Sequence, residues 1–287
     1  SLLTTHIAHL GPEGTYSDIA AIAYTQWLQA EYGVATNRQA FPSIQQALQS
    51  TVDGLSHYSV VPVENSIQGS VTVTLDTLWQ LEKLYIHHAL ILPIAHRLLS
   101  ASTHLSHIQR VYSHPQAIAQ CQQWLTQNLP TAEIVPTRST TEALSHLNQE
   151  KSSAGIASSR ASQLYQIPIL VEAINDHADN CTKFVSISLE PSTVGTRTSL
   201  AFSLPVNAPG ALLKPLQIFS TLNINLSRIE SRPTKRSLGE YLFFLDLEAS
   251  LADPQTQLAL DTLKACTETL KVFGSYSVIS ALSKAES

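Results

Sequence analysis

The stretch DNCTKFVSIS, residues 179–188, holds the pattern that decides the fold of the first two thirds of the chain. Its second half, FVSIS, alternates apolar and small polar residues, which is typical of a half-buried β-strand. Its first half, DNCTK, places a carboxylate, an amide, a thiol, a hydroxyl and an ammonium group at the mouth of that strand. A strand needs none of these groups. We therefore expect them to line a cleft at the rim of a sheet, where ligands of α/β proteins bind.

Strand and helix patterns alternate on the N-terminal side of this stretch, which predicts a mostly parallel α/β sheet. The expected strands are residues 7–11, 35–41, 57–66, 84–99, 108–115, 132–139 and the first part of 153–167. The expected helices are residues 17–33, 43–54, 116–129, 140–150 and the second part of 153–167.

A break in composition follows the stretch. EPSTVGTRT, residues 190–198, is rich in Pro, Gly, Ser and Thr and predicts a linker. After it, strand patterns surround two helix patterns, at about residues 209–222 and 254–270, in the order βαββαβ. This order is the ferredoxin-like α+β unit. The expected organisation is an α/β domain over residues 1–190, a linker over 191–198 and an α+β domain over 199–287.

Composition excludes several classes of protein. The chain has 287 residues, of which 44% are hydrophobic and 14% charged, so it can bury a sizeable core. Its formal net charge of -5 argues against nucleic acid as the main partner. The longest apolar run, residues 84–99, is broken by three histidines, a proline and an arginine and predicts no membrane span. Three widely spaced cysteines suit a reducing cytoplasm.

Small polar residues gather in loops of the α/β part. GPEGTYSD, residues 11–18, precedes a helix whose free N–H groups favour an anion. An ordinary helix cap after a tight turn explains the same residues equally well. SHPQAIAQC, residues 113–121, fits a capping box from Ser113 to Gln116, and Gln120 projects to the same face as Ser113. VPVENSIQGSV, residues 61–71, places polar residues directly after a strand. With NCTKF, these four loops predict a polar, anion-favouring cleft.

Two other chemistries fit the residues less well. The chain has eleven histidines, but none shows a zinc-binding spacing, and NDHADN, residues 175–180, reads as a solvated loop. Cys181 could act as a nucleophile with His114 or His177, yet a lone cysteine is more often inert packing.

The motifs GPEGTYSDIAA, VPVENSIQGSV, YSHPQAIAQC and NCTKF, in this order, resemble those of prephenate dehydratase, and NAPGALLKPL and SRIESRP resemble the ACT regulatory domain fused to it. The resemblance covers about residues 7–280. It implies a bilobed catalytic domain like a periplasmic binding protein, with the active site between the lobes. It also implies a carbon–oxygen lyase that converts prephenate to phenylpyruvate in phenylalanine biosynthesis, without a metal or organic cofactor.

The resemblance also implies roles for single residues. The catalytic candidates are Thr182, Asn65, Ser113 and Gln120. The substrate-binding candidates are Thr15, Tyr16, Ser17, Ser66, Lys183 and Phe184. We expect a hydrogen-bonding role for Thr182, because a threonine hydroxyl is a weak acid. Glu64 would repel a dianionic substrate, so we expect it to be structural.

Position 183 departs from the family, which usually has Thr-Arg-Phe where this chain has Thr-Lys-Phe. Lysine keeps the positive charge but loses the planar fork that binds a carboxylate through two hydrogen bonds. We favour a supporting electrostatic role for Lys183. The alternative is a salt bridge elsewhere, because Lys183 points away from Thr182 on a strand.

In the C-terminal part, the resemblance implies a feedback site for L-phenylalanine where two ACT domains pair in a homodimer or homotetramer. Its candidates are Asn207, Ala208, Gly210, Ala211, Leu212, Glu230 and Ser231. Pro209 would begin the following helix, and its N-terminus would favour the ligand carboxylate. The alternative is an ACT domain used only for dimerisation.

Two other functions stay open. Arogenate dehydratase carries out the same chemistry on the amino analogue with the same motifs. A non-catalytic amino-acid sensor could share the architecture, although the TKF and SHPQ clusters argue against it. No helical segment like chorismate mutase precedes Thr5, which favours a monofunctional enzyme.

Overall fold

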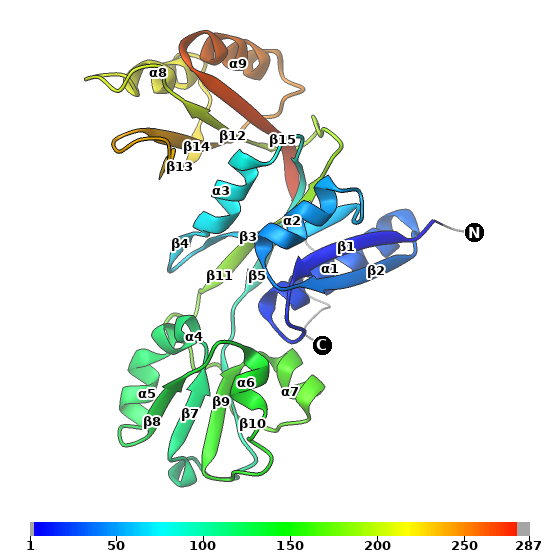
Figure 1. Cartoon of the computed structure of the whole chain (residues 1–287), viewed down its shortest axis with the longest axis vertical. Helices are drawn as coiled ribbons and strands as arrows, with labels where there is room; N and C mark the ends of the chain where they lie inside the picture. The colour runs from blue at the N-terminus through cyan, green and yellow to red at the C-terminus, as the bar shows by residue number, and fades with distance from the viewer. Residues whose placement is uncertain (1–2, 280–287) are drawn as a thin grey trace.

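The computed structural model describes residues 3–279, which form three parts stacked along the long axis of the molecule (Figure 1). The middle part, lobe 1, carries a mixed sheet with helices on its faces. Its strands are β1 (Thr5–Leu10), β2 (Thr36–Phe41), β3 (Tyr58–Asn65), β4 (Gly69–Ser70), β5 (Tyr85–Pro93) and β11 (Cys181–Ser188). Its helices are α1 (Tyr16–Tyr32), α2 (Ile44–Val52) and α3 (Thr72–Gln80).

Lobe 2 is a second α/β unit inserted between β5 and β11 (Figure 1). Its five-stranded sheet has the order β10-β6-β9-β7-β8. The strands are β6 (Arg97–Leu99), β7 (Arg110–Ser113), β8 (Glu133–Pro136), β9 (Ser153–Ala157) and β10 (Ile169–Val171). The helices are α4 (Pro115–Gln120), α5 (Gln122–Asn128), α6 (Thr140–Leu144) and α7 (Ser159–Tyr165), with a 3₁₀ turn at Leu105–His107.

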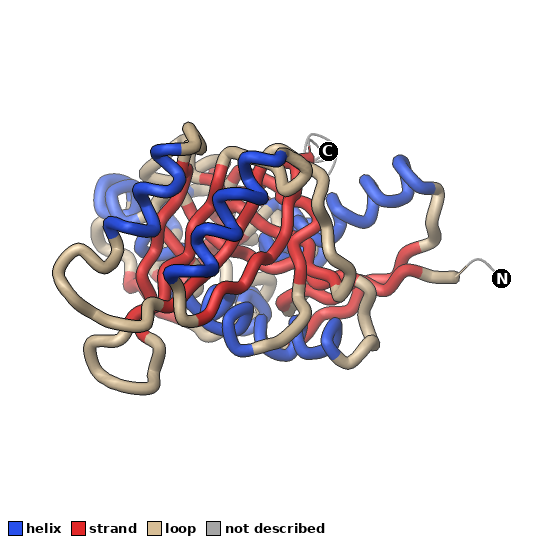
Figure 2. Tube along the Cα trace, turned by 90° about the horizontal axis from the view of Figure 1, so that it is seen from above, coloured by secondary structure: helices blue, strands red, loops and turns tan. Residues whose placement is uncertain are grey.

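The C-terminal domain has the predicted order βαββαβ. Its elements are β12 (Arg197–Ser203), α8 (Leu213–Thr221), β13 (Leu226–Pro233), β14 (Tyr241–Leu247), α9 (Pro254–Cys266) and β15 (Thr269–Ile279). The two helices lie side by side over one face of the four strands (Figure 2). The expectation of a bilobed α/β domain followed by a ferredoxin-like domain is therefore confirmed.

The C-terminal domain and lobe 1 share one ten-stranded sheet. Its order is β13-β14-β12-β15-β5-β11-β3-β1-β2, with β4 paired to β3. The first part of β15 pairs with β12. The end of β15, residues 277–279, pairs in parallel with residues 88–90 of β5. The predicted domain boundaries at 190 and 199 stay a prediction, because the last strand of the second domain is also a strand of lobe 1.

Local sequence signals explain where the helices of lobe 1 begin and end. Thr15 caps α1 by accepting a hydrogen bond from the Asp18 amide, and Ser43 caps α2 in the same way. Gly33 ends α1 in the left-handed region at φ 63°, where glycine is favoured. These residues fix the direction of each helix relative to the strand that it follows.

Several expectations about single elements were wrong. The apolar run 84–99 forms two strands, β5 and β6, in two different sheets. Both sheets are mixed, since β11 and β6 run antiparallel to their neighbours. The helix α3 was missed. Helix α8 begins at Leu213, so Pro209 lies outside it, and α9 ends at Cys266.

The proposed capping box at Ser113 was also wrong. His114 is the cap of α4 and accepts from the Gln116 amide, while the Ser113 hydroxyl donates to the Ile156 carbonyl at 3.0 Å. Pro115 explains this difference, because proline is preferred at the first position of a helix and places the cap at the residue before it.

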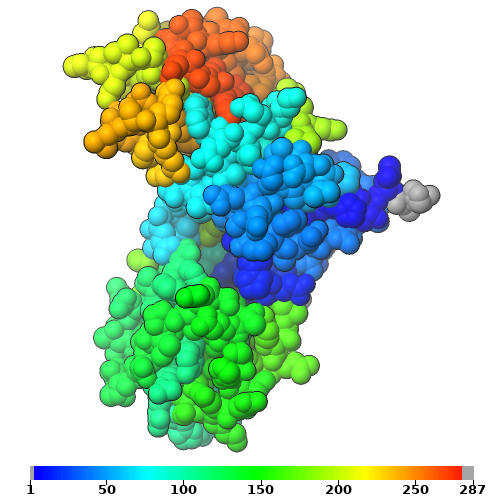
Figure 3. Space-filling view, in the orientation of Figure 1, coloured from blue at the N-terminus to red at the C-terminus, as the bar shows by residue number. Residues whose placement is uncertain are grey.

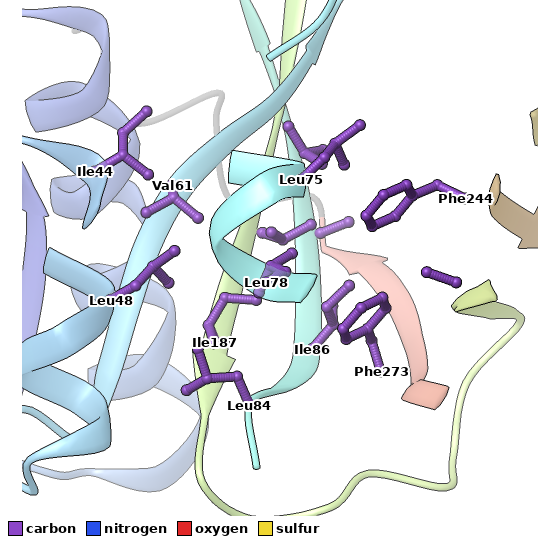
Figure 4. Packing of buried hydrophobic residues seen from close by; sticks show 14 of the residues in the cluster. Ile44, Leu48, Val61, Leu75, Leu78, Leu84, Ile86, Ile187, Phe244 and Phe273 are labelled. Atoms are coloured by element: carbon purple, nitrogen blue, oxygen red, sulfur yellow. The ribbon is translucent and has the colours of Figure 1, made fainter. Parts of the chain in front are cut away.

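A hydrophobic core joins lobe 1 to the C-terminal domain. Figure 4 shows Leu75, Leu78 and Ile86 of lobe 1 facing Phe244 and Phe273 of the C-terminal domain, and all five are at most 4% exposed. A buried core of this kind transmits small displacements, because protein interiors have low compressibility.

Candidate active site

Two chain segments cross between the lobes and lie against each other. Residues 94–96 lead from β5 to β6, and residues 172–180 lead from β10 back to β11. The Ile94 amide donates to the Asn180 carbonyl at 2.9 Å. His96 and Asn180 therefore lie in the segments that connect the lobes. The molecule narrows between its blue and green parts (Figure 3).

Asn65 ends β3 and is held by the turn that follows. Its Oδ1 accepts from the amides of Ile67 at 2.9 Å and Gln68 at 3.0 Å. Asparagine commonly makes such bonds to its own turn. Since both bonds use the oxygen, the Asn65 NH₂ group is left to face β11.

A row of hydrogen bonds runs from this amide across both lobes. Asn65 Nδ2 donates to Thr182 Oγ1 at 2.9 Å and to Asn180 Oδ1 at 3.0 Å. Asn180 Nδ2 donates to Gln120 Oε1 at 3.0 Å, which lies 2.6 Å from His96 Nε2. The structure therefore brings together three of the predicted catalytic residues, Asn65, Thr182 and Gln120. It adds Asn180 and His96, which the sequence did not predict as site residues.

These five side chains are largely withdrawn from water. The exposed fraction is 2% for Asn180, 4% for His96, 5% for Asn65, 6% for Gln120 and 8% for Thr182. Burial lowers the pKa of His96, and the hydrogen bond to Gln120 offsets this only in part. His96 is therefore neutral near neutral pH. Because Gln120 Oε1 only accepts, Nε2 carries the proton of that neutral ring.

The start of α1 adjoins this row through Tyr16. The Tyr16 hydroxyl donates to the Ala95 carbonyl at 2.8 Å and lies 3.3 Å from His96 Nδ1. Thr15 serves as the helix cap, and its hydroxyl donates to the Pro12 carbonyl at 2.9 Å. Ser17 is buried on the same turn.

Positive charge also gathers at the start of α1. Asp18 is fully buried and paired with Arg38 and with Arg160 of lobe 2, at 2.6 Å for Arg160 Nε. Burial raises the pKa of Asp18, but the Gly14 amide and both guanidinium groups lower it below its usual range. The two guanidinium groups and the one carboxylate together carry a net positive charge and tie the two lobes together, while Glu13 adds a negative charge in the same loop.

Other predicted site residues stand apart from the row. Ser66 Oγ accepts from the Cys181 amide at 3.0 Å, so it fastens the β3 turn to β11. Ser113 lies at the end of β7, 1% exposed, and donates to backbone. Phe184 is 2% exposed in the core of lobe 1. Cys181 bonds through its backbone to Asn65 and Ser66.

Lys183 points away from Thr182, to the C-terminal domain. Its Nζ lies 3.5 Å from Asp246 Oδ2 and donates to the Tyr276 hydroxyl at 3.2 Å. This is the alternative that the sequence left open, a salt bridge elsewhere, and the structure does not bring Lys183 to the row of polar groups. Glu64, expected to be structural, pairs with Arg228 at 3.0 Å.

Five of the seven predicted effector residues line one pocket of about 340 Å³ in the C-terminal domain. They are Asn207, Ala208, Gly210, Ala211 and Leu212. Thr234, Arg236 and Glu240 add polar groups to its wall. The other two candidates lie on β13: Glu230 accepts from the Ser70 hydroxyl of lobe 1 at 3.1 Å, and Ser231 is exposed.

Over residues 3–279, no group of three or more His, Cys, Asp or Glu side chains is arranged to hold a metal ion. None of the helices in that range is long and apolar enough to cross a membrane.

Fold and site together define a two-lobed α/β protein with a neutral polar site between its lobes and a ferredoxin-like domain at its C-terminal side. Residues 7–192 match the family model of prephenate dehydratase, and residues 198–264 match the ACT domain. The chain belongs to the prephenate dehydratase family and carries an ACT domain.

Relatives with known names agree with this family. The chain is 36% identical over 273 residues to a bifunctional chorismate mutase/prephenate dehydratase of Aquifex aeolicus, covering 94% of this chain and 73% of the relative. It is 32% identical to a prephenate dehydratase of Lactococcus lactis, covering 96% of this chain and 98% of the relative.

Solved structures are similar over almost the whole chain. A prephenate dehydratase of Arthrobacter aurescens in complex with L-Phe has a TM-score of 0.83 at 31% identity, covering 96% of this chain and 90% of that one. GqqA, described as a novel type of quorum quenching acylase, has a TM-score of 0.77 at 27% identity, covering 97% and 99%. The fold therefore occurs with more than one described activity, so the site must carry the functional argument.

Proposed function

We propose that this protein is a carbon–oxygen lyase that converts prephenate to phenylpyruvate, with Thr182 as its central catalytic group. The observation that carries the proposal is the hydrogen bond from Asn65 Nδ2 to Thr182 Oγ1. Since Asn65 supplies a proton to this oxygen, Thr182 keeps its own proton for another acceptor. The departing hydroxyl of prephenate is such an acceptor.

The reaction needs little beyond position and hydrogen bonding. The bond from the ring to its carboxylate breaks and releases carbon dioxide. Its electron pair enters the ring, which becomes aromatic, and the ring C–O bond breaks. The oxygen leaves as water with a proton taken from solvent. A hydrogen bond from Thr182 stabilises the negative charge that grows on this oxygen, and a neutral hydroxyl suffices for that.

The two carboxylates of prephenate require favourable partners. We assign them to the start of α1, close to Thr15, Tyr16 and Ser17, because the N-terminus of a helix favours an anion. The net positive charge of the Asp18, Arg38 and Arg160 group supports this assignment. Gln120 and Ser113 would orient the ring from lobe 2, while Ser66 and Phe184 shape the strand ends.

We further propose that L-phenylalanine inhibits the enzyme by binding the ACT domain. The pocket lined by Asn207, Gly210 and Leu212 supports this, as does the L-Phe complex of the relative from Arthrobacter aurescens. In the shared sheet, β13 is an edge strand. Pairing of this edge with a second copy would form a homodimer or homotetramer and bring Glu230 and Ser231 near the pocket of the other copy.

A location in the cytoplasm completes the proposal. Cys121, Cys181 and Cys266 are free thiols, which suits a reducing compartment.

A steady-state assay of the purified protein tests the proposal, with prephenate and arogenate in parallel and with and without L-phenylalanine. We expect phenylpyruvate from prephenate, suppressed by L-phenylalanine. Thr182→Ala should lower kcat by at least ~10², because one hydrogen-bond donor to the transition state is lost. Thr182→Ser keeps the hydroxyl and is the matched control, expected to stay within about tenfold of wild type.

Each other outcome assigns a different function. Turnover of arogenate alone would keep the mechanism and change the substrate. Binding of L-phenylalanine without turnover of either compound would indicate an amino-acid sensor. A Thr182→Ala variant within a few-fold of wild type would remove Thr182 from the mechanism.

A further inference from the structure

The residues next to the proposed catalytic pair face the ACT domain. Thr182 of β11 lies opposite Asn65 of β3, and the adjacent cross-strand pair is Lys183 and Glu64. Successive side chains of a strand point to opposite faces of the sheet. One cross-strand pair therefore belongs to the active site, and its neighbour on the same two strands points to the regulatory domain.

The ACT domain presents a complementary cross-strand pair, Arg228 of β13 and Asp246 of β14. Lys183 Nζ lies 3.5 Å from Asp246 Oδ2, and Arg228 Nε lies 3.0 Å from Glu64 Oε2. Arg228 Nη1 also lies 3.9 Å from Asp246 Oδ2. These four side chains, which we call the four-charge cluster, carry two positive and two negative charges, each facing its opposite across the domain boundary.

Three side chains of the four-charge cluster are largely buried and well satisfied, whereas the Glu64 side chain is 40% exposed. The exposed fractions are 17% for Lys183, 8% for Asp246 and 10% for Arg228. Ser199 Oγ donates to Asp246 Oδ1 at 2.6 Å. Burial alone would lower the pKa of Lys183, but Asp246 and Tyr276 raise it above its usual value, so the ammonium group stays charged. Removing one partner of a buried pair leaves an unpaired charge, which is strongly unfavourable.

The surroundings of the cluster leave little room for it to adjust. A cavity of about 20 Å³, enough for roughly one water molecule, lies beside Lys183 and Arg228. Residues of the hydrophobic core in Figure 4 line this cavity from both domains. We therefore expect a movement of β13 or β14 to reach Lys183 and Glu64 through these ion pairs, and Thr182 and Asn65 through the backbone.

We propose that Lys183 and Glu64 are positioning residues, which hold Thr182 and Asn65 in register with the ACT domain and so let that domain control the active site. This inference rests on the proposed function for its kinetic readout. Strand β13 is the point of entry, since it carries Arg228 and also Glu230, a predicted effector residue that contacts Ser70 of lobe 1. An effector that displaces β13 would then displace Thr182.

Lys183→Met and Asp246→Asn break the same contact from its two sides, so one variant remains if the other fails to fold. We expect kcat for prephenate to fall about tenfold, with KM changed less than about threefold. Inhibition by L-phenylalanine should weaken while its affinity, measured by calorimetry, stays within about threefold. Lys183→Arg, which keeps the charge, should restore kcat to within about threefold of wild type.

Asp76→Asn is the matched control. Asp76 of α3 makes an ion pair with Arg232 of the ACT domain at 2.8 Å, but α3 carries none of the polar groups of the active site. This variant also loses a contact between the domains, at a similar degree of burial. We expect its kcat to match wild type, because the four-charge cluster stays intact; inhibition by L-phenylalanine is not used as a control, because Arg232 lies on β13.

A structural readout keeps the inference testable if prephenate is not the substrate. NMR spectra of protein with ¹³C-labelled threonine methyl groups report on Thr182, whose signal is assigned by its loss in Thr182→Ser. We expect this signal to shift in Lys183→Met and in Asp246→Asn. It should not shift in Asp76→Asn. The inference would be overturned if Lys183→Met and Asp246→Asn both had the kcat, the inhibition by L-phenylalanine and the Thr182 signal of the wild type. A shifted signal with no turnover in wild type would refute the proposed function and leave the positioning role standing.

Discussion

His88 of β5 shows how burial of a single residue makes the stability of the fold depend on pH. Its ring lies 4.4 Å from that of Trp27, and its Nδ1 is 3.1 Å from the Tyr24 hydroxyl. Burial, with a smaller contribution from the charge of His87, lowers its pKa from 6.5 to about 4. The native state therefore holds this ring neutral at pH values where the unfolded chain binds a proton.

This shift predicts a loss of stability in mild acid. Between 6.5 and about 4 the unfolded state binds more protons, so the contribution of His88 is complete above 6.5 and is lost as the pH falls towards 4. From about pH 7 to about pH 5, the loss is at most about 2 kcal/mol in the free energy of unfolding. Urea titrations at both pH values give the free energy of unfolding that is lost on acidification. This loss should be up to about 2 kcal/mol smaller in His88→Phe than in wild type. His146→Gln, at an exposed position, should behave as wild type; equal losses in all three would contradict the prediction.

Local patterns marked polar groups of the candidate site, whereas the proposed roles of single residues rested on the family resemblance. Thr182, Asn65 and Gln120 stand at strand ends or on a helix face, where a polar side chain is unexpected. His96 was missed because it sits in an apolar run, and Asn180 because the strand entry holds several polar residues at once. Their contacts depend on two crossings of the chain between lobes, which no local pattern contains.

At the scale of elements, Gly195 in the segment before β12 must pack against β15. Its φ is +151°, and a Cβ added there would lie 2.3 Å from the Tyr276 carbonyl carbon. The next residue, Thr196, donates its amide to the Tyr276 carbonyl at 3.0 Å. This close approach explains a glycine within a segment that sequence reasoning could identify only as a linker.

Gly195→Ala should therefore destabilise the protein by about 2–4 kcal/mol, because the segment has to move away from β15. Gly239→Ala is the control for backbone strain alone. Gly239 also has a positive φ, +86°, but a Cβ there would meet no atom within 4 Å. We expect Gly239→Ala to lower the free energy of unfolding by about 1 kcal/mol. Denaturant unfolding of both variants compares them, and equal losses would show that contact with β15 is not the cause.

Element types were easier to predict than element partners. Periodicity predicted the βαββαβ order of the ACT domain correctly, whereas α3 of lobe 1 was missed. The sharing of β15 between two domains was not predictable, because its sequence gives no sign that residues 269–276 pair with β12 and the last three residues with β5. The run 84–99 likewise reads as one strand, since both of its halves are buried in a sheet.

At the scale of the whole molecule, the shared sheet and the shared core predict that catalytic and regulatory parts unfold together. Calorimetry of the full chain should show one cooperative transition, although family models divide the chain near residue 195. A fragment of residues 1–192 would expose the edge of β5 and the core residues that face Phe244 and Phe273. We expect this fragment to melt at a lower temperature than the full chain and to aggregate. Two separate transitions in the full chain, one matching the fragment, would show instead that the domains are thermodynamically independent.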